Sequence, residues 1–284
     1  MLEIGGTHVS AALVDPAGWS VQSATRLHLD ADADAESVLA RFFQAAARVD
    51  AHPGATWGVA MPDPFDYERG LALFEGVGKF ASLRGVDVGT ALRRGIRPHP
   101  GDVRFLNDAD AFLLGEWACG SARGAARCAG ITLGTGVGSG WLVGGVVTDP
   151  GYPPGGRIHR ISLSGRPLED FMSRRAIRRA FAAAGGDASL DVREIADLAR
   201  SGDRTARHVL DTAFVTLGRV VGSCLSGFRA DVLVIGGSMA ASWDLFERAF
   251  RAGAEGSGLP VIRVAADSER APLVGAAVHA LRPG

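Results

Sequence analysis

Residues 131–140 read Ile131-Thr132-Leu133-Gly134-Thr135-Gly136-Val137-Gly138-Ser139-Gly140, and this stretch decides the fold. Apolar residues lead into alternate glycines, and Trp141-Leu142-Val143 follows, which predicts a strand, a tight turn and a second strand. Glycine weakens a strand by roughly 0.5–1 kcal/mol relative to alanine, so a merely structural turn would seldom carry four. Glycine also permits positive φ angles and lets successive amides approach an anion as a nest. We therefore predict a phosphate-binding turn that uses Gly134, Thr135, Gly136 and Gly138.

Two further turns have the same character. The chain opens with a short strand, the turn Gly5-Gly6-Thr7 and a second strand over 9–14. Taken alone, this turn is more typical of a plain hairpin, but the repeated strand, turn and strand indicates a duplicated lobe. Gly236-Gly237-Ser238 follows the buried strand 231–235, a place where open α/β sheets bind ligands. Together the three turns predict a cleft floor built around a nucleotide.

Hydrophobic periodicity extends this pattern along the chain. Strands are expected at 21–29, 57–61, 103–106 and 259–264, and helices at 86–94, 109–120, 168–183, 192–200, 205–227, 240–252 and 273–281. These elements predict an α/β fold with a small lobe over 1–106 and a larger lobe over 107–272. The final helix, within 273–284, is expected to pack back on the first lobe.

Composition excludes several classes of protein. The 284 residues are 47% hydrophobic, and 30 Lys and Arg against 31 Asp and Glu give a net charge of −1. No global field therefore favours nucleic acid or a membrane as partner. The start of the chain has no signal-peptide pattern, and no apolar run reaches 18 residues, so a cytoplasmic location is expected. Three scattered cysteines argue against disulfides and thiolate metal sites.

The candidate catalytic carboxylate follows a predicted strand in Leu106-Asn107-Asp108-Ala109-Asp110. Neither the P-loop pattern nor a dinucleotide-binding fingerprint occurs in the chain. Phosphoryl transfer to a hydroxyl needs a carboxylate within hydrogen-bond reach of the acceptor. Asp108 is suited to accept the proton, and Asn107 to position a neighbouring hydroxyl. Helix N-capping by Asn107 or Asp108 is the structural alternative, and Asp110 is the rival base.

These motifs, in order and spacing, resemble the ROK family of sugar kinases and sugar-responsive repressors. The resemblance implies a two-lobed, actin-like (ribonuclease-H-like) fold with an interlobe cleft, ATP and Mg²⁺ as cofactors, a homodimer, and Asp108 as general base. It also implies that the turns at 5–7 and 134–138 hold phosphates and that Gly236 and Gly237 lie by the adenosine. ROK repressors carry a DNA-binding segment ahead of the first glycine turn, which here begins at residue 5, so the kinase branch is favoured. The motifs that carry the resemblance are Glu3-Ile4-Gly5-Gly6-Thr7, Asn107-Asp108-Ala109-Asp110-Ala111 with Gly115-Glu116, the stretch 131–140, Ile235-Gly236-Gly237 and Leu273-Val274-Gly275-Ala276-Ala277.

The sequence departs from the family pattern at the metal and zinc positions. Glu3 stands where the family has Asp, so its water-mediated contact with the metal is altered, and His8 stands where the family has Lys. The family's cysteine-rich zinc motif is missing from Ser162-Leu163-Ser164-Gly165, so no zinc is expected.

The acceptor site departs as well. His159 and Glu169 match sugar-contacting residues of the family, but Gly156 replaces an acidic one. The loop Glu75-Gly76-Val77-Gly78-Lys79-Phe80 also replaces an Asn-containing loop. A modified hexose, amino sugar or cyclitol is therefore expected rather than plain glucose. A sugar-binding sensor without turnover, and a kinase that uses polyphosphate, remain as alternatives.

Overall fold

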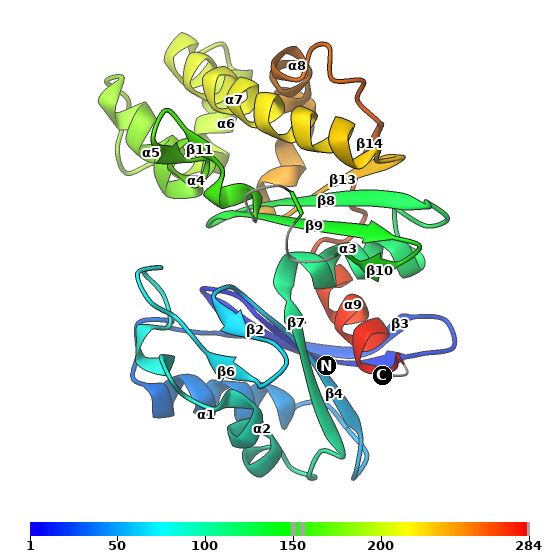
Figure 1. Ribbon diagram of the computed structural model, residues 1–284. Helices are drawn as coiled ribbons and strands as arrows, with labels where there is room; N and C mark the ends of the chain where they lie inside the picture. Colours follow the sequence, from blue (N-terminus) through cyan, green and yellow to red (C-terminus); the bar gives the residue numbers. More distant parts are fainter. Residues whose placement is uncertain (149–151, 154–156, 283–284) are drawn as a thin grey trace. The chain divides into compact units, whose positions relative to one another are not determined.

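The computed structural model describes residues 1–148, 152–153 and 157–282. The chain divides into two compact units (Figure 1). Unit 1 comprises Met1–Arg123 and Glu269–Gly284, and unit 2 comprises Gly124–Ser268. The chain therefore leaves unit 1 once, completes unit 2, and returns.

Unit 1 is built on a five-stranded mixed sheet with the order β3-β2-β1-β4-β7. The three N-terminal strands form an antiparallel meander, and β1, β4 and β7 run parallel. This arrangement brings the end of β7 beside the end of β4, because Asn107 pairs with Met61. The strands are β1 Leu2–Ile4, β2 His8–Asp15, β3 Ser20–His28, β4 Thr56–Met61, β7 Asp102–Asn107 and the small hairpin β5 Phe65–Asp66 and β6 Leu71–Ala72.

Unit 2 repeats the same topology in a sheet with the order β10-β9-β8-β13-β14. Here β10, β9 and β8 are antiparallel, and β8, β13 and β14 are parallel. The duplicated lobe predicted from the two glycine turns is confirmed. The strands are β8 Arg127–Leu133, β9 Val137–Val143, β10 Val146–Val147, β13 Val232–Gly236, β14 Val261–Val264 and the hairpin β11 Ser162–Leu163 and β12 Arg166–Pro167.

Helices α3 (Asp108–Cys119) and α9 (Ala271–Ala280) pack closely within unit 1. A side chain at Gly275 would strike the carbonyl oxygen of Ala111, and one at Gly115 would strike that of Ala271. Glycines thus let the two backbones touch. The lobe boundary expected near residue 107 is wrong for this reason, since α3 is held by α9 and the division falls after Arg123. The other helices of unit 1 are α1 Ala35–Ala46, α2 Val88–Gly95 and the 3-10 helix η1 Ala81–Leu83.

Unit 2 has its core around the long helix α7 (Arg204–Phe228). This helix is long and apolar enough to cross a membrane, but 56% of its apolar window is buried inside the protein. It packs on α8 (Trp243–Gly253), where the rings of Phe214 and Phe246 stack with centroids 4.0 Å apart. The remaining helices are α4 Glu169–Met172, α5 Arg174–Ala183, α6 Val192–Arg200 and the 3-10 helices η2 Ile158–Arg160 and η3 Ser238–Ser242.

Candidate active site

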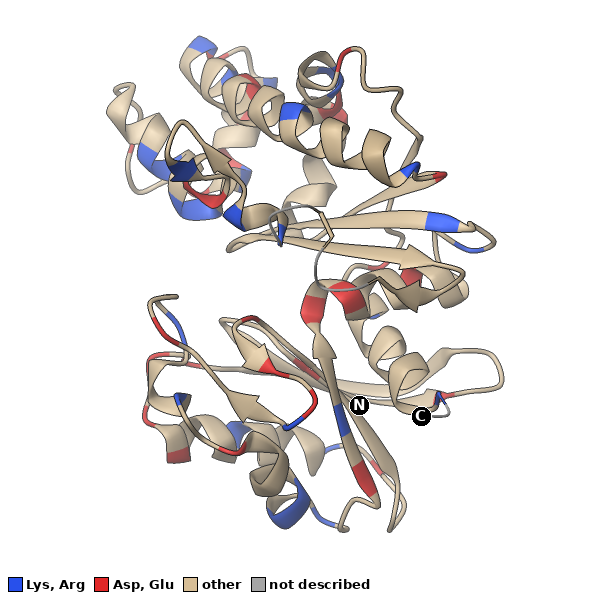
Figure 2. Cartoon of the chain, in the orientation of Figure 1, with Lys and Arg blue, Asp and Glu red and all other residues tan. Residues whose placement is uncertain are grey.

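Asn107 forms the junction between β7 and α3, where acidic residues gather (Figure 2). Its Oδ1 atom accepts hydrogen bonds from the backbone N–H groups of Ala109, at 3.0 Å, and Asp110, at 3.3 Å. These two donors would otherwise lack partners in the first turn of the helix. The N-capping alternative is therefore observed for Asn107.

The other end of the Asn107 amide is engaged as well. Its Nδ2 atom donates to Asp63 Oδ2 at 3.3 Å and to the Tyr67 hydroxyl at 3.2 Å. Tyr67 in turn donates its proton toward Asp63 Oδ1, 2.8 Å away. An Asn side chain offers two acceptor sites and two donors, so all four are used. A direct contact between Asn107 and a substrate hydroxyl requires one of these bonds to give way.

Asp108 lies one residue further on, with its carboxylate partly exposed. Its Oδ1 atom also accepts from the Ala109 N–H, at 2.9 Å. Burial raises the pKa of the Asp108 carboxyl, and the negative charges of Asp63 and Glu3 raise it further. The positive charge of Lys79 and the Ala109 N–H act in the opposite direction. A carboxylate with a raised pKa is a stronger base, as general-base catalysis requires.

Asp110, the rival base, is only 6% exposed. It lies inside the first turn of α3, a helix whose eight positions after Asp108 are all buried. Of the two carboxylates, Asp108 is therefore the one that a substrate can reach.

The first glycine turn lies beside Glu3 and His8. The ring of His8 covers Gly5, where a Cβ atom would come within 2.5 Å of His8 Cε1. His8 Nε2 lies 3.1 Å from Glu3 Oε2, so these two side chains are bonded across β1 and β2. The N–H of Gly5 donates to the His8 carbonyl within the turn. An anion here would take amides from Gly6 and Thr7.

The second glycine turn lies between β8 and β9 in unit 2. The Gly134 carbonyl accepts from the backbone N–H of Arg174, the first residue of α5, at 3.2 Å. A side chain on Gly136 would strike the carboxylate of Glu169 at the start of α4. The structure thus brings the predicted phosphate turn and the predicted sugar-contacting Glu169 together. Thr135, at the tip of the turn, is exposed.

The third turn is adjacent to the second. Gly236 pairs with Thr132 across the parallel strands β13 and β8. Gly237 has a φ of +82°, and a Cβ atom there would lie 2.7 Å from the Leu133 nitrogen. The hydroxyl oxygen of Ser238 comes within 3.5 Å of a Cβ position on Gly134. Two of the three predicted turns therefore meet at the ends of neighbouring strands.

The glycines of the first two turns lack the backbone conformation of a nest, and their binding of phosphate stays a prediction. None of Gly5, Gly6, Gly134 and Gly136 adopts the left-handed φ that the nest hypothesis requires. Gly5 and Gly136 are glycines because the His8 ring and the Glu169 carboxylate occupy the space of a side chain. Crowding, rather than backbone conformation, explains them.

His159 lies in η2 and is half-buried. Gly156, which replaces an acidic residue in the family's sugar-reading motif, lies outside the described residues. Asp63, Tyr67 and Lys79 were not singled out as site residues from the sequence. They lie between 28 and 44 residues before Asn107, and of the three only Lys79 lies in a segment, residues 75–80, that the sequence had linked to acceptor binding.

The described residues contain no cluster of three or more His, Cys, Asp and Glu side chains arranged to hold a metal ion. Mg²⁺ is commonly held by one or two carboxylates together with substrate phosphates. Glu3 and Asp108 act on each other electrostatically within unit 1 and could supply such carboxylates. The residues present therefore fit a magnesium ion that arrives with a nucleotide.

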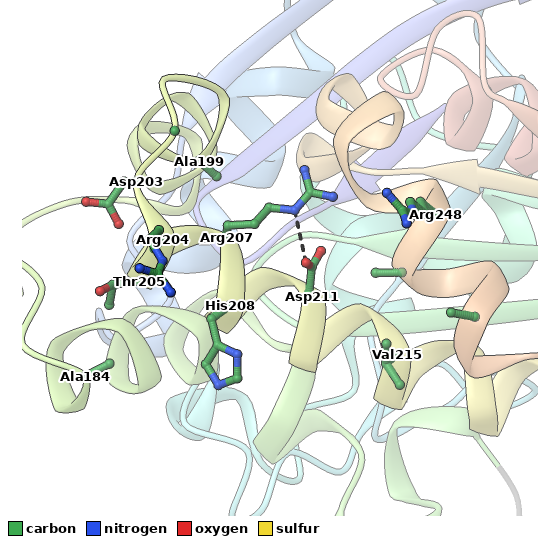
Figure 3. Close-up of a pocket in the computed structure, with 13 residues that line it drawn as sticks. Ala184, Ala199, Asp203, Arg204, Thr205, Arg207, His208, Asp211, Val215 and Arg248 are labelled. Atoms are coloured by element: carbon green, nitrogen blue, oxygen red, sulfur yellow. Dashed lines mark hydrogen bonds and ion pairs between the residues drawn. The ribbon is translucent and has the colours of Figure 1, made fainter.

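A separate pocket of about 1040 Å³ lies on unit 2, between α7 and α8 (Figure 3). Its basic lining is partly neutralised, because Arg207 pairs with Asp211 at 3.0 Å. It contains none of the residues predicted from the sequence. We assign it no role in the site.

The comparisons with known proteins agree with this arrangement. The model of the ROK family matches residues 1–151 and 164–282. Glucokinase from Thermotoga maritima is 28% identical over 270 residues, covering 86% of this chain and 83% of its own. The ROK hexokinase from Thermus thermophilus superposes with a TM-score of 0.79 at 26% identity, over 98% of this chain and 96% of its own.

A third relative is the ROK family glucokinase from Streptomyces griseus, solved with glucose and AMPPNP. It has a TM-score of 0.80 at 22% identity, over 98% of this chain and 97% of its own. The fold is the two-lobed, actin-like ATPase fold expected from the resemblance. The chain belongs to the ROK family.

Proposed function

We propose that this protein is an ATP-dependent carbohydrate kinase that phosphorylates a hydroxyl of a hexose or hexose-like molecule, with Asp108 as general base. The observation that carries the proposal is the partly exposed Asp108 carboxylate at the end of β7, whose pKa is raised by burial. The first two glycine turns support it. One joins β1 to β2 and the other joins β8 to β9, which are equivalent places in two sheets of the same topology. The relatives named as glucokinase and hexokinase support the same class of reaction.

In this mechanism Asp108 accepts the proton of the attacking hydroxyl as its oxygen bonds to the transferred phosphorus. Gly5 to Thr7 and Gly134 to Gly138 bind phosphate oxygens through main-chain amides, and Thr7 and Thr135 add hydroxyl donors. Gly236 and Gly237 lie near the adenosine. Glu3 would hold Mg²⁺ through water, and the ion would supply positive charge that offsets the charge of the phosphates.

Glu169 and His159 contact the acceptor, and Asn107 lies beside the base. The Glu169 carboxylate lies against Gly136. The residue proposed to contact the sugar and a residue proposed to bind the phosphates of ATP are therefore neighbours at this turn. Since Gly156 supplies no carboxylate, a modified hexose, amino sugar or cyclitol is favoured over glucose.

A sugar-binding sensor of the same fold is the second candidate. The bond between Glu3 and His8 favours it, because it occupies a carboxylate that the proposed kinase uses for its metal. Turnover distinguishes the two candidates.

The test measures ADP release with ATP and Mg²⁺ across hexoses, amino sugars and cyclitols, and it measures formation of the phosphorylated acceptor when polyphosphate replaces ATP as donor. Wild type is compared with Asp108→Asn, which keeps the shape of the side chain. Loss of a general base is expected to reduce kcat by about 10²–10⁴-fold. Saturable sugar binding with no release of product from any acceptor or donor would establish the sensor instead.

A further inference from the structure

One lysine occurs in the whole chain. Lys79 is the single lysine among 30 Lys and Arg residues, and the other basic residues are all arginines. Arginine carries a broad, planar, weakly hydrated charge, whereas lysine carries a compact ammonium on a flexible stem. The chain thus holds its one compact side-chain cation in the loop after β6.

The end of this loop is firmly anchored. Phe74 and Phe80, which flank residues 75–79, are 1% and 0% exposed, and their ring centroids lie 5.2 Å apart. The Phe80 N–H donates to the Ala31 carbonyl at 2.8 Å. Phe80 also has a φ of 56°, which is unusual for a bulky residue and is maintained only where the surroundings enforce it. Lys79 is therefore held beside a fixed point.

The Lys79 side chain runs along the first glycine turn toward the catalytic carboxylate. Its Cδ atom lies 3.8 Å from the position of a Cβ on Gly6. Its charge is close enough to Asp108 to lower the pKa of that carboxyl against the effect of burial. Across residues 1–148, 152–153 and 157–282, Lys79 has no hydrogen bond and no ion pair within 4.0 Å. A half-buried ammonium with no hydrogen-bonded or closely paired anion would be stabilised by binding one.

We propose that Lys79 is a catalytic residue whose ammonium group contacts the oxygen atoms of the phosphoryl group during transfer. The inference rests on the proposed kinase activity and assigns a residue to it. A phosphoryl group that passes from the Gly5-Gly6-Thr7 turn to an acceptor at Asp108 passes the end of this side chain.

Phosphoryl transfer involves no oxidation or reduction. The acceptor oxygen forms a bond to the terminal phosphorus of the nucleoside triphosphate, and its proton moves to Asp108. The bond between that phosphorus and the bridging oxygen breaks, and its electron pair leaves with the nucleoside diphosphate. Lys79 stays protonated throughout and offsets the negative charge on the equatorial oxygens.

The kinetic test compares Lys79→Met, Lys79→Arg and Arg84→Met. Arg84 is an exposed cation near the same loop that pairs with Glu75 at 2.9 Å, so its loss controls for net charge. Lys79→Met is expected to lower kcat by about 10²–10³-fold with little change in the acceptor KM. Lys79→Arg should recover part of that loss, and Arg84→Met should leave kcat unchanged. An unchanged kcat in Lys79→Met, or a rise in acceptor KM alone, overturns the assignment.

A labelling test does not depend on turnover or on any substitution. Lys79 is the chain's only side-chain amine, so its acylation can be followed by peptide mass spectrometry in the wild-type protein. With Mg²⁺ present, a non-hydrolysable nucleoside triphosphate should slow acylation strongly, and the diphosphate should slow it less, because the terminal phosphate is missing. Equal protection by both, or protection by sugars alone, refutes the phosphoryl contact. If wild type releases no ADP, the kinase proposal fails while this result still decides the contact.

Discussion

Asn107 donates from Nδ2 to the Asp63 carboxylate at 3.3 Å, and this bond sets which way round its amide lies. A carboxylate only accepts, so it must meet the NH₂ group. The carbonyl oxygen of the same amide is then turned toward the N-terminus of α3, where it shares the Ala109 N–H with Asp108. A residue from the loop after β4 thereby helps to orient the proposed base.

Replacing Asp63 with Asn is expected to move the acidic limb of the pH profile of kcat/KM to lower pH. The groups acting on Asp108 are Asp63 and Glu3, which raise its pKa, and Lys79, which lowers it. Removing the Asp63 charge removes one of the raising effects. Tyr67→Phe is the matched control, because it removes a hydrogen bond to Asp63 and keeps the charge. Identical shifts in the two variants would contradict the electrostatic explanation.

Replacing Lys79 with Met is expected to move the same limb in the opposite direction. Its positive charge lowers the pKa of Asp108, so its loss leaves burial and the two carboxylates to act alone. The acidic limb should therefore appear at higher pH than in wild type. The profile of the remaining activity, measured with saturating nucleotide, tests this, and a shift to lower pH would show that Lys79 does not face the base.

Asp108→Asn is expected to raise the free energy of unfolding at pH 7. The pKa of Asp108 is raised in the folded protein above the unfolded value of 3.8, so the folded state binds more protons between these two pKa values. Its contribution to stability is fully present below pH 3.8 and is lost as pH rises through the folded pKa.

Asparagine does not ionise, so the variant does not lose this stability as the pH rises. Its excess in free energy of unfolding over wild type should therefore shrink as the pH falls toward 3.8. Urea unfolding of both proteins at several pH values measures the difference. Equal stability at pH 7 would mean that the Asp108 carboxylate is solvated.

Gly275→Ala is expected to destabilise unit 1. Alanine favours helices by itself, but its methyl group would strike the Ala111 carbonyl oxygen across the contact between α9 and α3. Overpacking of this kind costs about 1–3 kcal/mol. Gly18→Ala, which meets no atom within 4 Å, should change stability by less than about 0.5 kcal/mol. Chemical denaturation measures the stability of the two variants. Equal stability would contradict the close contact between Gly275 and the Ala111 carbonyl oxygen.

Local sequence patterns predicted helices and strands well where hydrophobic spacing and capping residues indicate the same boundaries. The helix expected over 192–200 is observed as Val192–Arg200, because its apolar spacing and capping residues agree. The single helix expected over 168–183 breaks at Ser173, whose hydroxyl accepts the Ala176 N–H and starts α5. Apolar periodicity continues through such a break, so the sequence alone does not reveal it.

The site was predictable only in part, for a similar reason. Asp108 and the glycine turns lie in short motifs, and their chemistry can be inferred from the residues next to them in the sequence. Asp63, Tyr67 and Lys79 reach the same place through tertiary folding, since they follow β4, β5 and β6 respectively. For Lys79 the sequence offered two signals, its place in the loop 75–80 and the rarity of lysine in this chain.

The division of the chain also sets an order for folding during synthesis. Unit 2 is one continuous segment, Gly124–Ser268, whereas unit 1 needs Glu269–Gly284 to complete it. Unit 2 can therefore fold without residues of unit 1, whereas the face of α3 that receives α9 stays uncovered until the C-terminal segment docks. The half of the protein that carries Asp108 is made first and completed last, so a chain truncated before Glu269 would contain every strand of the second sheet and leave the unit that carries Asp108 unfinished.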